Sequence, residues 1–127
     1  MQTVLIVDDN ADERLIFTAV LQHHGYRVLT AGDGPGAIDV AKKHTPGIIL
    51  MDVHLPGMNG LDATQAIRSS PVTSGIPVIC VTSFDVTVAE ARGAGCQRLL
   101  RKPVSPSQLI SAVTATLTEP IPGPSQA

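Results

Sequence analysis

The chain has 127 residues, a formal net charge of −2, and a composition that is 43% hydrophobic and 16% charged. This length and balance predict one folded domain with a single core, and they exclude a disordered chain. The sequence has no basic cluster, no Trp and few other aromatic residues, which argues against a nucleic-acid-binding surface. No apolar run reaches membrane-spanning length and no signal peptide precedes the first predicted strand, so we expect a cytoplasmic protein with no membrane contact.

Five short apolar runs alternate with five segments of helical pattern. The predicted strands cover residues 3–7, 26–30, 47–51, 76–81 and 97–100. The predicted helices cover residues 11–24, 36–43, 61–69, 85–92 and 106–118. This alternation predicts an α/β fold in which a parallel sheet carries helices on both faces, wound with right-handed crossovers.

The apolar faces of the first and last helices can be read from their spacing. In the first helix, the residues at helical spacing are Ala11, Leu15, Ile16, Ala19 and Val20, and we expect them to pack on the sheet. In the last helix, which Ser105 is expected to cap, the apolar stripe consists of Leu109, Ile110, Val113 and Leu117.

The two cysteines, Cys80 and Cys96, lie in an apolar run and near the start of a strand. They match no zinc spacing with each other or with the histidines of the chain, which are His23, His24, His44 and His54. We therefore expect reduced thiols in or near the core of a cytosolic protein, and no metal site built on nitrogen and sulfur.

Reactive polar groups stand at the carboxyl ends of four predicted strands. The first strand ends at Asp8 and Asp9, the third at Asp52, the fourth at Thr82 and the fifth at Lys102. In a parallel sheet of this kind, ligands bind beyond the carboxyl ends of the strands. Asp52 alone could instead be a cap of the next helix, but the combination of groups favours a functional site at this edge.

The charges at this edge indicate its chemistry. Three carboxylates in one place repel one another unless cations intervene, and Lys102 supplies one positive charge. The remaining negative charge and the all-oxygen ligands suit Mg²⁺. A carboxylate beside Mg²⁺, a hydroxyl and an amine suits phosphoryl transfer, with an aspartate as nucleophile. The sequence has neither a Walker-type loop nor a G-x-G-x-x-G motif, so a nucleotide is not the expected substrate.

Four motifs, in this order and at these separations, resemble the receiver domain of two-component response regulators, in its stand-alone form. They are Val7-Asp8-Asp9-Asn10, Met51-Asp52 with Leu55-Pro56-Gly57-Met58-Asn59-Gly60, Val81-Thr82-Ser83, and Lys102-Pro103. The resemblance implies a flavodoxin-like, doubly wound, five-stranded sheet of order 2-1-3-4-5 over residues 1–118. Residues 119–127 are rich in proline and are expected to be a disordered tail.

The resemblance also implies a role for each residue of the site. Asp52 would accept a phosphoryl group, Thr82 would bond to that group, and Lys102 would pair with it. Mg²⁺ would be held by Asp8, Asp9, Asp52 and the backbone carbonyl of His54. The Lys102–Pro103 peptide bond is expected to be cis, which would aim the lysine inward.

A receiver of this kind is a phosphorylation switch and not an enzyme, beyond self-catalysed phosphoryl transfer and autodephosphorylation. The resemblance implies a sensor histidine kinase or a histidine phosphotransfer protein as donor, and an unidentified protein as downstream target. We expect a monomer or a weak dimer.

The chain departs from the family pattern between residues 82 and 104. Leu99 occupies a position that is normally Tyr or Phe, so the usual conformational read-out is in question. The segment from Thr82 to Gly95 is shorter than is usual, and its helix is expected to be weak because residues 86–88 are all β-branched. His54 and Phe84 occupy positions that, in the family, flank the attacking water.

Three other functions fit parts of the sequence. A phosphorylation-independent interaction module would agree with Leu99 but not with the complete acid, hydroxyl and lysine set. A flavin-binding protein of the same fold would need a Ser/Thr-rich phosphate loop and stacking aromatics, which are missing. A small hydrolase that uses the aspartate is also compatible with the site.

Overall fold

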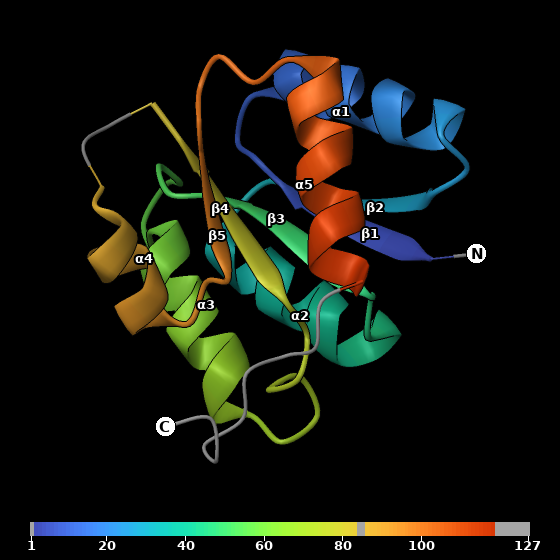
Figure 1. Ribbon diagram of the computed structural model, residues 1–127. Coiled ribbons are helices and arrows are strands. Elements are labelled where there is room, and N and C mark those ends of the chain that lie inside the picture. The colour runs from blue at the N-terminus through green and yellow to red at the C-terminus, as the bar shows by residue number, and fades with distance from the viewer. Residues whose placement is uncertain (1, 84–85, 119–127) are drawn as a thin grey trace.

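The computed structural model describes residues 2–83 and 86–118, and within them a five-stranded parallel sheet lies between two layers of helices (Figure 1). The strand order is β2-β1-β3-β4-β5, as predicted. The strands are β1 (Thr3–Val7), β2 (Arg27–Ala31), β3 (Ile48–Asp52), β4 (Val78–Thr82) and β5 (Arg98–Arg101). The helices are α1 (Ala11–His23), α2 (Gly34–His44), α3 (Gly60–Ser69), α4 (Val88–Ala94) and α5 (Pro106–Thr118). The predicted tail at 119–127 lies outside the described residues.

The sheet separates two apolar cores. The inner strands β3 and β4 are buried along their whole length, which explains why they are continuous apolar runs without polar alternation. Along β1, Leu5 and Val7 pack toward α2, α3 and α4, whereas Val4 and Ile6 pack toward α1 and α5. The period of two in the strand therefore supplies both cores from one run of sequence.

Most of the predicted apolar face of α1 is exposed, although Val20 is partly buried and packs against the core. Leu15 is 69% exposed and Ile16 is 57% exposed, while Phe17 and Leu21 are the buried residues of this helix. Apolar residues occur on nearly all sides of α1, so spacing alone could not select the face. Phe17 and Leu21 are four residues apart and both join the core beside α5.

Two helix starts also differ from the predicted ones, because capping residues fix them. α2 begins at Gly34 and not at residue 36, since the Asp33 carboxylate accepts a 2.7 Å hydrogen bond from the Gly36 N–H and Pro35 fits the first turn. α4 begins at Val88, where Thr87 and Glu90 form a reciprocal capping box. It continues through Gly93 to a left-handed Gly95, whose φ is +110°.

The strand register brings the carboxyl ends of β1, β3, β4 and β5 to one edge of the sheet. Val7 pairs with Met51, Asp52 with Val81, and Thr82 with Arg101. The residues that directly follow or end these strands must therefore meet at that edge. The Lys102–Pro103 peptide bond is cis, as predicted. Among the described residues, no helix is long and apolar enough to cross a membrane.

Gly60 closes the loop after β3 against the strand itself, and its replacement is our first test of this packing. The Gly60 N–H donates to the Val53 carbonyl at 2.8 Å, and a Cβ at this position would overlap the Asp52 carbonyl oxygen. We expect Gly60→Ala to lower the free energy of unfolding by about 1–3 kcal/mol in urea denaturation.

Gly93→Ala is the matched control, since a Cβ at residue 93 meets nothing within 4 Å and the residue lies inside α4. Here alanine should raise the free energy of unfolding by about 0.5–1 kcal/mol, because it favours the helix. Equal effects of the two substitutions would contradict the packing assigned to Gly60.

Candidate functional site

Two buried carboxylates lie at the carboxyl ends of β1 and β3. Asp8 is 2% exposed and Asp52 is 5% exposed. Asp8 Oδ1 accepts a hydrogen bond from the Asn10 N–H at 2.9 Å, and Asp52 Oδ1 accepts one from the His54 N–H at 3.1 Å. Each acid is thus oriented by the backbone two residues further along the chain, which leaves its second oxygen for other partners.

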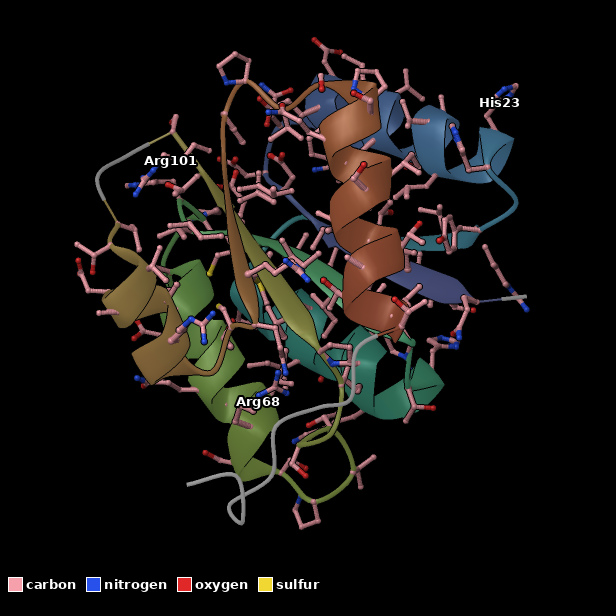
Figure 2. All side chains as sticks on the ribbon, viewed as in Figure 1. His23, Arg68 and Arg101 are labelled. Atoms are coloured by element: carbon pink, nitrogen blue, oxygen red, sulfur yellow. The ribbon has the colours of Figure 1, made fainter. Side chains whose placement is uncertain are left out.

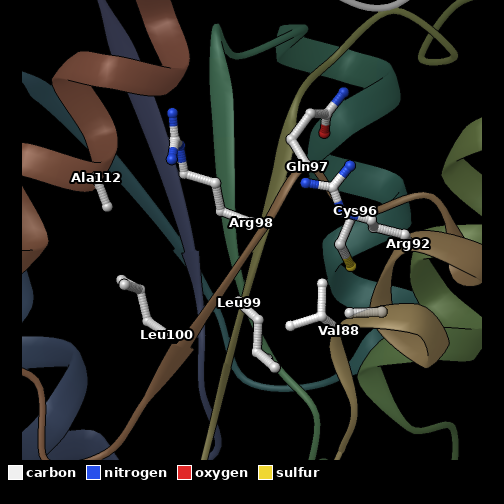
Figure 3. Close-up of a pocket in the computed structure, with 9 residues that line it drawn as sticks. Val88, Arg92, Cys96, Gln97, Arg98, Leu99, Leu100 and Ala112 are labelled. Carbon is white, nitrogen blue, oxygen red and sulfur yellow. The ribbon is translucent and has the colours of Figure 1, made fainter.

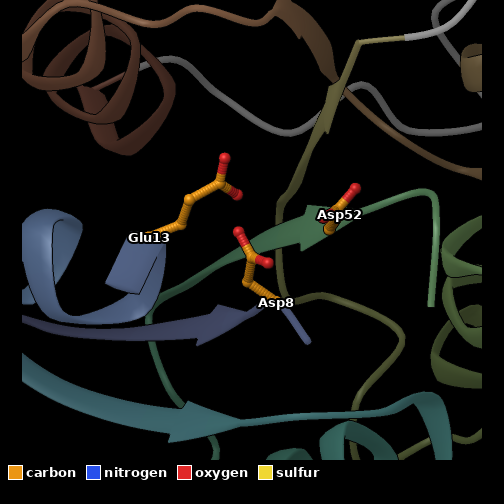
Figure 4. Close-up of side chains that lie close together, drawn as sticks. All are labelled: Asp8, Glu13 and Asp52. Atoms are coloured by element: carbon orange, nitrogen blue, oxygen red, sulfur yellow. The ribbon is translucent and has the colours of Figure 1, made fainter. Parts of the chain in front are cut away.

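Lys102 joins these acids to a third one. Its Nζ lies 2.6 Å from Glu13 Oε2, 3.0 Å from Asp52 Oδ2 and 3.6 Å from Asp8 Oδ2. The Lys102 N–H donates to the Thr82 carbonyl at 2.9 Å, so the end of β4 positions the lysine backbone. Figure 4 shows the three acids gathered where α1 begins and where β1 and β3 end.

The pKa values of the charged groups in the site are shifted because these groups lie close together and are partly or fully buried. Burial raises the pKa of Asp8 to about 7, and hydrogen bonding with Glu13 adds to the rise. The same hydrogen bond holds the pKa of Glu13 below its usual value. Burial alone would lower the pKa of Lys102, but its hydrogen bonds to Glu13 and Asp52 raise it above its usual range, so this residue carries a positive charge.

The carboxylates are arranged in a way that fits a divalent cation. One oxygen from each of Asp8, Glu13 and Asp52 lies within 4.8 Å of the others. A single ammonium group does not balance three carboxylates, so a divalent cation would offset the remaining negative charge. Oxygen ligands of this kind suit Mg²⁺ better than a transition metal.

The structure brings most of the predicted site residues together. Lys102 Nζ lies 3.0 Å from Asp52 and 3.6 Å from Asp8. Thr82 is fully buried at the end of the neighbouring strand. The side chain of His54 is exposed, while its backbone N–H contacts Asp52. Asp9 is exposed and does not belong to the converging carboxylates. Phe84 lies outside the described residues.

Sequence reasoning missed Glu13 and Arg14, both in the first turns of α1. Arg14 Nη1 donates to the Asp8 carbonyl at 2.6 Å and so holds the backbone that carries the first acid. The spacing Asn10-x-x-Glu13 did carry a signal, because it is that of a capping box and places Glu13 above the same sheet edge. Asn10 does cap the Glu13 N–H at 3.0 Å, but the glutamate carboxylate turns to Lys102.

Comparison with known proteins identifies the class. The profile of the response regulator receiver domain matches residues 4–114, so the chain belongs to this family. Protein PilH of Pseudomonas aeruginosa is 38% identical over 119 residues, which cover 92% of this chain and 98% of PilH. The polar-differentiation response regulator DivK of Brucella anthropi is 33% identical over 118 residues, which cover 91% of this chain and 96% of DivK.

A solved structure of a similar domain contains a magnesium ion. The receiver domain of the sensor histidine kinase PA1611 from Pseudomonas aeruginosa matches with a TM-score of 0.85 and 29% identity, over 93% of this chain and 98% of that domain. Its crystal structure has a magnesium ion coordinated in the active site cleft. The present chain is thus a receiver domain of two-component signalling, with an acidic group that could bind a metal.

The raised pKa of Asp8 predicts how stability depends on pH in the presence of a chelator. A carboxyl whose pKa rises from 3.8 to about 7 on folding binds its proton more tightly in the folded state. Its stabilising contribution is present at low pH and is lost as the pH rises through about 7. Asp8→Asn should therefore raise the melting temperature more at pH 8 than at pH 5, both measured by thermal unfolding.

Asp9→Asn removes a neighbouring but exposed carboxylate and is the control for net charge. If both variants raised the melting temperature equally at pH 8, the effect would be one of overall charge and not of the buried site.

Proposed function

We propose that this receiver domain accepts a phosphoryl group on Asp52, in a Mg²⁺-dependent reaction, and signals through contact with another protein. The observation that carries this proposal is the buried Asp52 carboxylate, with one oxygen held by the backbone and the other 3.0 Å from Lys102. The donor would be the phosphohistidine of a sensor histidine kinase or of a histidine phosphotransfer protein, and the reaction would take place in the cytoplasm.

Asp52 would act as the nucleophile. A bond would form between a carboxylate oxygen and phosphorus while the N–P bond of the donor breaks, and the imidazole nitrogen would keep the electron pair. Lys102 would pair with the incoming phosphoryl oxygens, since its charge already faces Asp52. Thr82, at the neighbouring strand end, would supply a hydroxyl to the same group.

The metal would lie among the acids at this edge. Asp8, Asp9, Asp52 and the backbone carbonyl of His54 are the proposed ligands. Mg²⁺ would supply the positive charge that neutralises phosphoryl oxygens during transfer. Glu13 is closest to Lys102, and we assign it to the ion pair with the lysine and not to the metal.

Intact-mass measurement after incubation with acetyl phosphate and Mg²⁺ tests the acceptor. We expect the wild type to gain the mass of one phosphoryl group and Asp52→Asn to gain nothing, because the nucleophile is missing. Asp62→Asn is the matched control, since it removes an exposed carboxylate in the first turn of α3, and it should be labelled like the wild type.

A chelator should abolish the adduct. If the wild type shows no adduct, binding of a beryllofluoride mimic in the presence of Mg²⁺ distinguishes fast hydrolysis from a site that accepts no phosphoryl group. Absence of both adduct and mimic binding would contradict the proposal and would favour a phosphorylation-independent module.

Calorimetric titration with Mg²⁺ tests the assignment of the ligands. Asp9→Asn should weaken Mg²⁺ binding by about tenfold or more, because it removes a proposed ligand. Glu13→Gln should leave the affinity close to that of the wild type. An equal loss in the two variants would place Glu13 among the ligands, as its distance to Asp8 and Asp52 permits.

The read-out is proposed to differ from the usual mode of the family. Leu99 is only partly buried and packs against the core beside α4, where it offers less area than the aromatic side chain of the pattern. α4 is short, with seven residues. Both features lie in the region that would report phosphorylation.

Amide chemical shifts with and without beryllofluoride test this hypothesis. We expect clear shifts at residues 52–54, which adjoin the acceptor, and small shifts over residues 86–104. Large shifts over residues 86–104 would show that Leu99 transmits the signal in the usual way.

A further inference from the structure

The two cysteines of the chain lie against each other in the core. Cys80 is in the middle of β4 and Cys96 follows α4, and their Sγ atoms are 2.6 Å apart. This separation is about 0.5 Å longer than a disulfide bond, whose length is near 2.05 Å. Since the chain has only these two cysteines, each thiol has one possible partner within the molecule.

We propose that Cys80 and Cys96 form a reversible dithiol–disulfide site that is oxidised by hydrogen peroxide. The inference is independent of phosphorylation, because it depends on the placement of β4 and of the turn before β5. It gives the thiols, which were expected to remain reduced, a chemical role.

A cavity leads to one of the two sulfurs. A hollow of about 250 Å³ lies between α4, β5 and α5, and Cys96 is among its lining residues (Figure 3). Cys96 is 4% exposed, whereas Cys80 is completely buried and does not line the cavity. A peroxide molecule is small enough for such a space, so Cys96 is the cysteine that oxidant reaches first.

The surroundings of Cys96 also favour its thiolate. When Cys96 is a thiolate, the Cys80 thiol is the donor in the hydrogen bond between the two sulfurs. This hydrogen bond, with Thr64 and the positive charge of Arg68, holds the pKa of Cys96 below its usual value. The same hydrogen bond and burial raise the pKa of Cys80. Arg68, which Figure 2 labels, lies on α3. Its Nε donates a 3.0 Å hydrogen bond to the carbonyl of Gly95, the residue before Cys96.

The reaction balances in two steps. The Cys96 thiolate attacks one peroxide oxygen, so that an S–O bond forms, the O–O bond breaks, and the leaving hydroxide takes up a proton to become water. The Cys80 sulfur then attacks the Cys96 sulfur, so that the S–S bond forms and the sulfenic oxygen leaves as a second water with the Cys80 proton. Two thiols are oxidised and one peroxide is reduced. A dithiol reductant reverses the result by exchange.

The bond would restrain one part of the molecule. The two cysteines are 16 residues apart, and the segment between them contains Thr82 and the whole of α4. A link from β4 to the turn before β5 closes this segment into a ring, which reduces its conformational freedom.

Mass spectrometry of the full chain after exposure to a small excess of hydrogen peroxide tests the site. We expect a monomer that is about 2 Da lighter, with no thiol left for alkylation under denaturing conditions, and complete recovery with dithiothreitol. Retention of both thiols, a disulfide-linked dimer, or only sulfinic and sulfonic products would overturn the proposal.

Single serine variants test the order of the steps. In Cys80→Ser, Cys96 should stop at a sulfenic acid that dimedone traps, because its partner is missing. In Cys96→Ser, the buried Cys80 should react far more slowly than Cys96 does in the other variant. The opposite order would overturn the assignment of Cys96 as the attacking thiol. The wild-type measurement remains decisive if either variant folds poorly.

Hydrogen exchange on the wild type tests the restraint. Amide exchange in residues 88–97 should be slower in the oxidised protein than in the reduced one. Unchanged exchange there would overturn the proposed restraint of α4.

Discussion

The contact between Lys102 and Asp52 depends on the register of the whole sheet. These residues are 50 positions apart in the sequence, and they meet only because β3, β4 and β5 run parallel and end together. β4 lies between the two and supplies Thr82, whose carbonyl holds the lysine backbone. A shift of one residue in any of these pairings would move the amine or the acid to the other face of the sheet. The site is therefore a direct product of the register.

Much of the fold and of the site could be predicted from the sequence, because the sequence patterns that indicate them are local. Each inner strand is a short apolar run that ends in a reactive side chain, and parallel topology is enough to bring those ends together. The helix boundaries were harder, since Asp33 and Thr87 set them by capping and not by apolar spacing. The buried face of α1 was predicted incorrectly for a related reason. The helix is apolar on more than one side, and packing against both the sheet and α5 selects Phe17 and Leu21.

The site residue that sequence analysis missed depends on a contact between distant parts of the chain. Glu13 and Lys102 are 89 residues apart, and no pattern near Glu13 indicates which of its possible partners it meets. The close approach of Cys80 and Cys96 is hidden in the same way, because one lies in a strand and the other in a turn. Residue types can be read from sequence, but distances between elements follow from packing.

The ion pairs of Lys102 limit how this residue can bind a further group. An ammonium group has three N–H donors, and three carboxylates already surround this one. Glu13 and Asp52 accept hydrogen bonds from it, and Asp8 lies farther away at 3.6 Å, so any further oxygen that binds the lysine competes with these carboxylates. The partner with the most freedom to move away is Glu13, since its side chain is more exposed than that of Asp8 or Asp52. A group that bound Lys102 at the end of β3 would therefore compete first with the contact that the lysine makes at the start of α1.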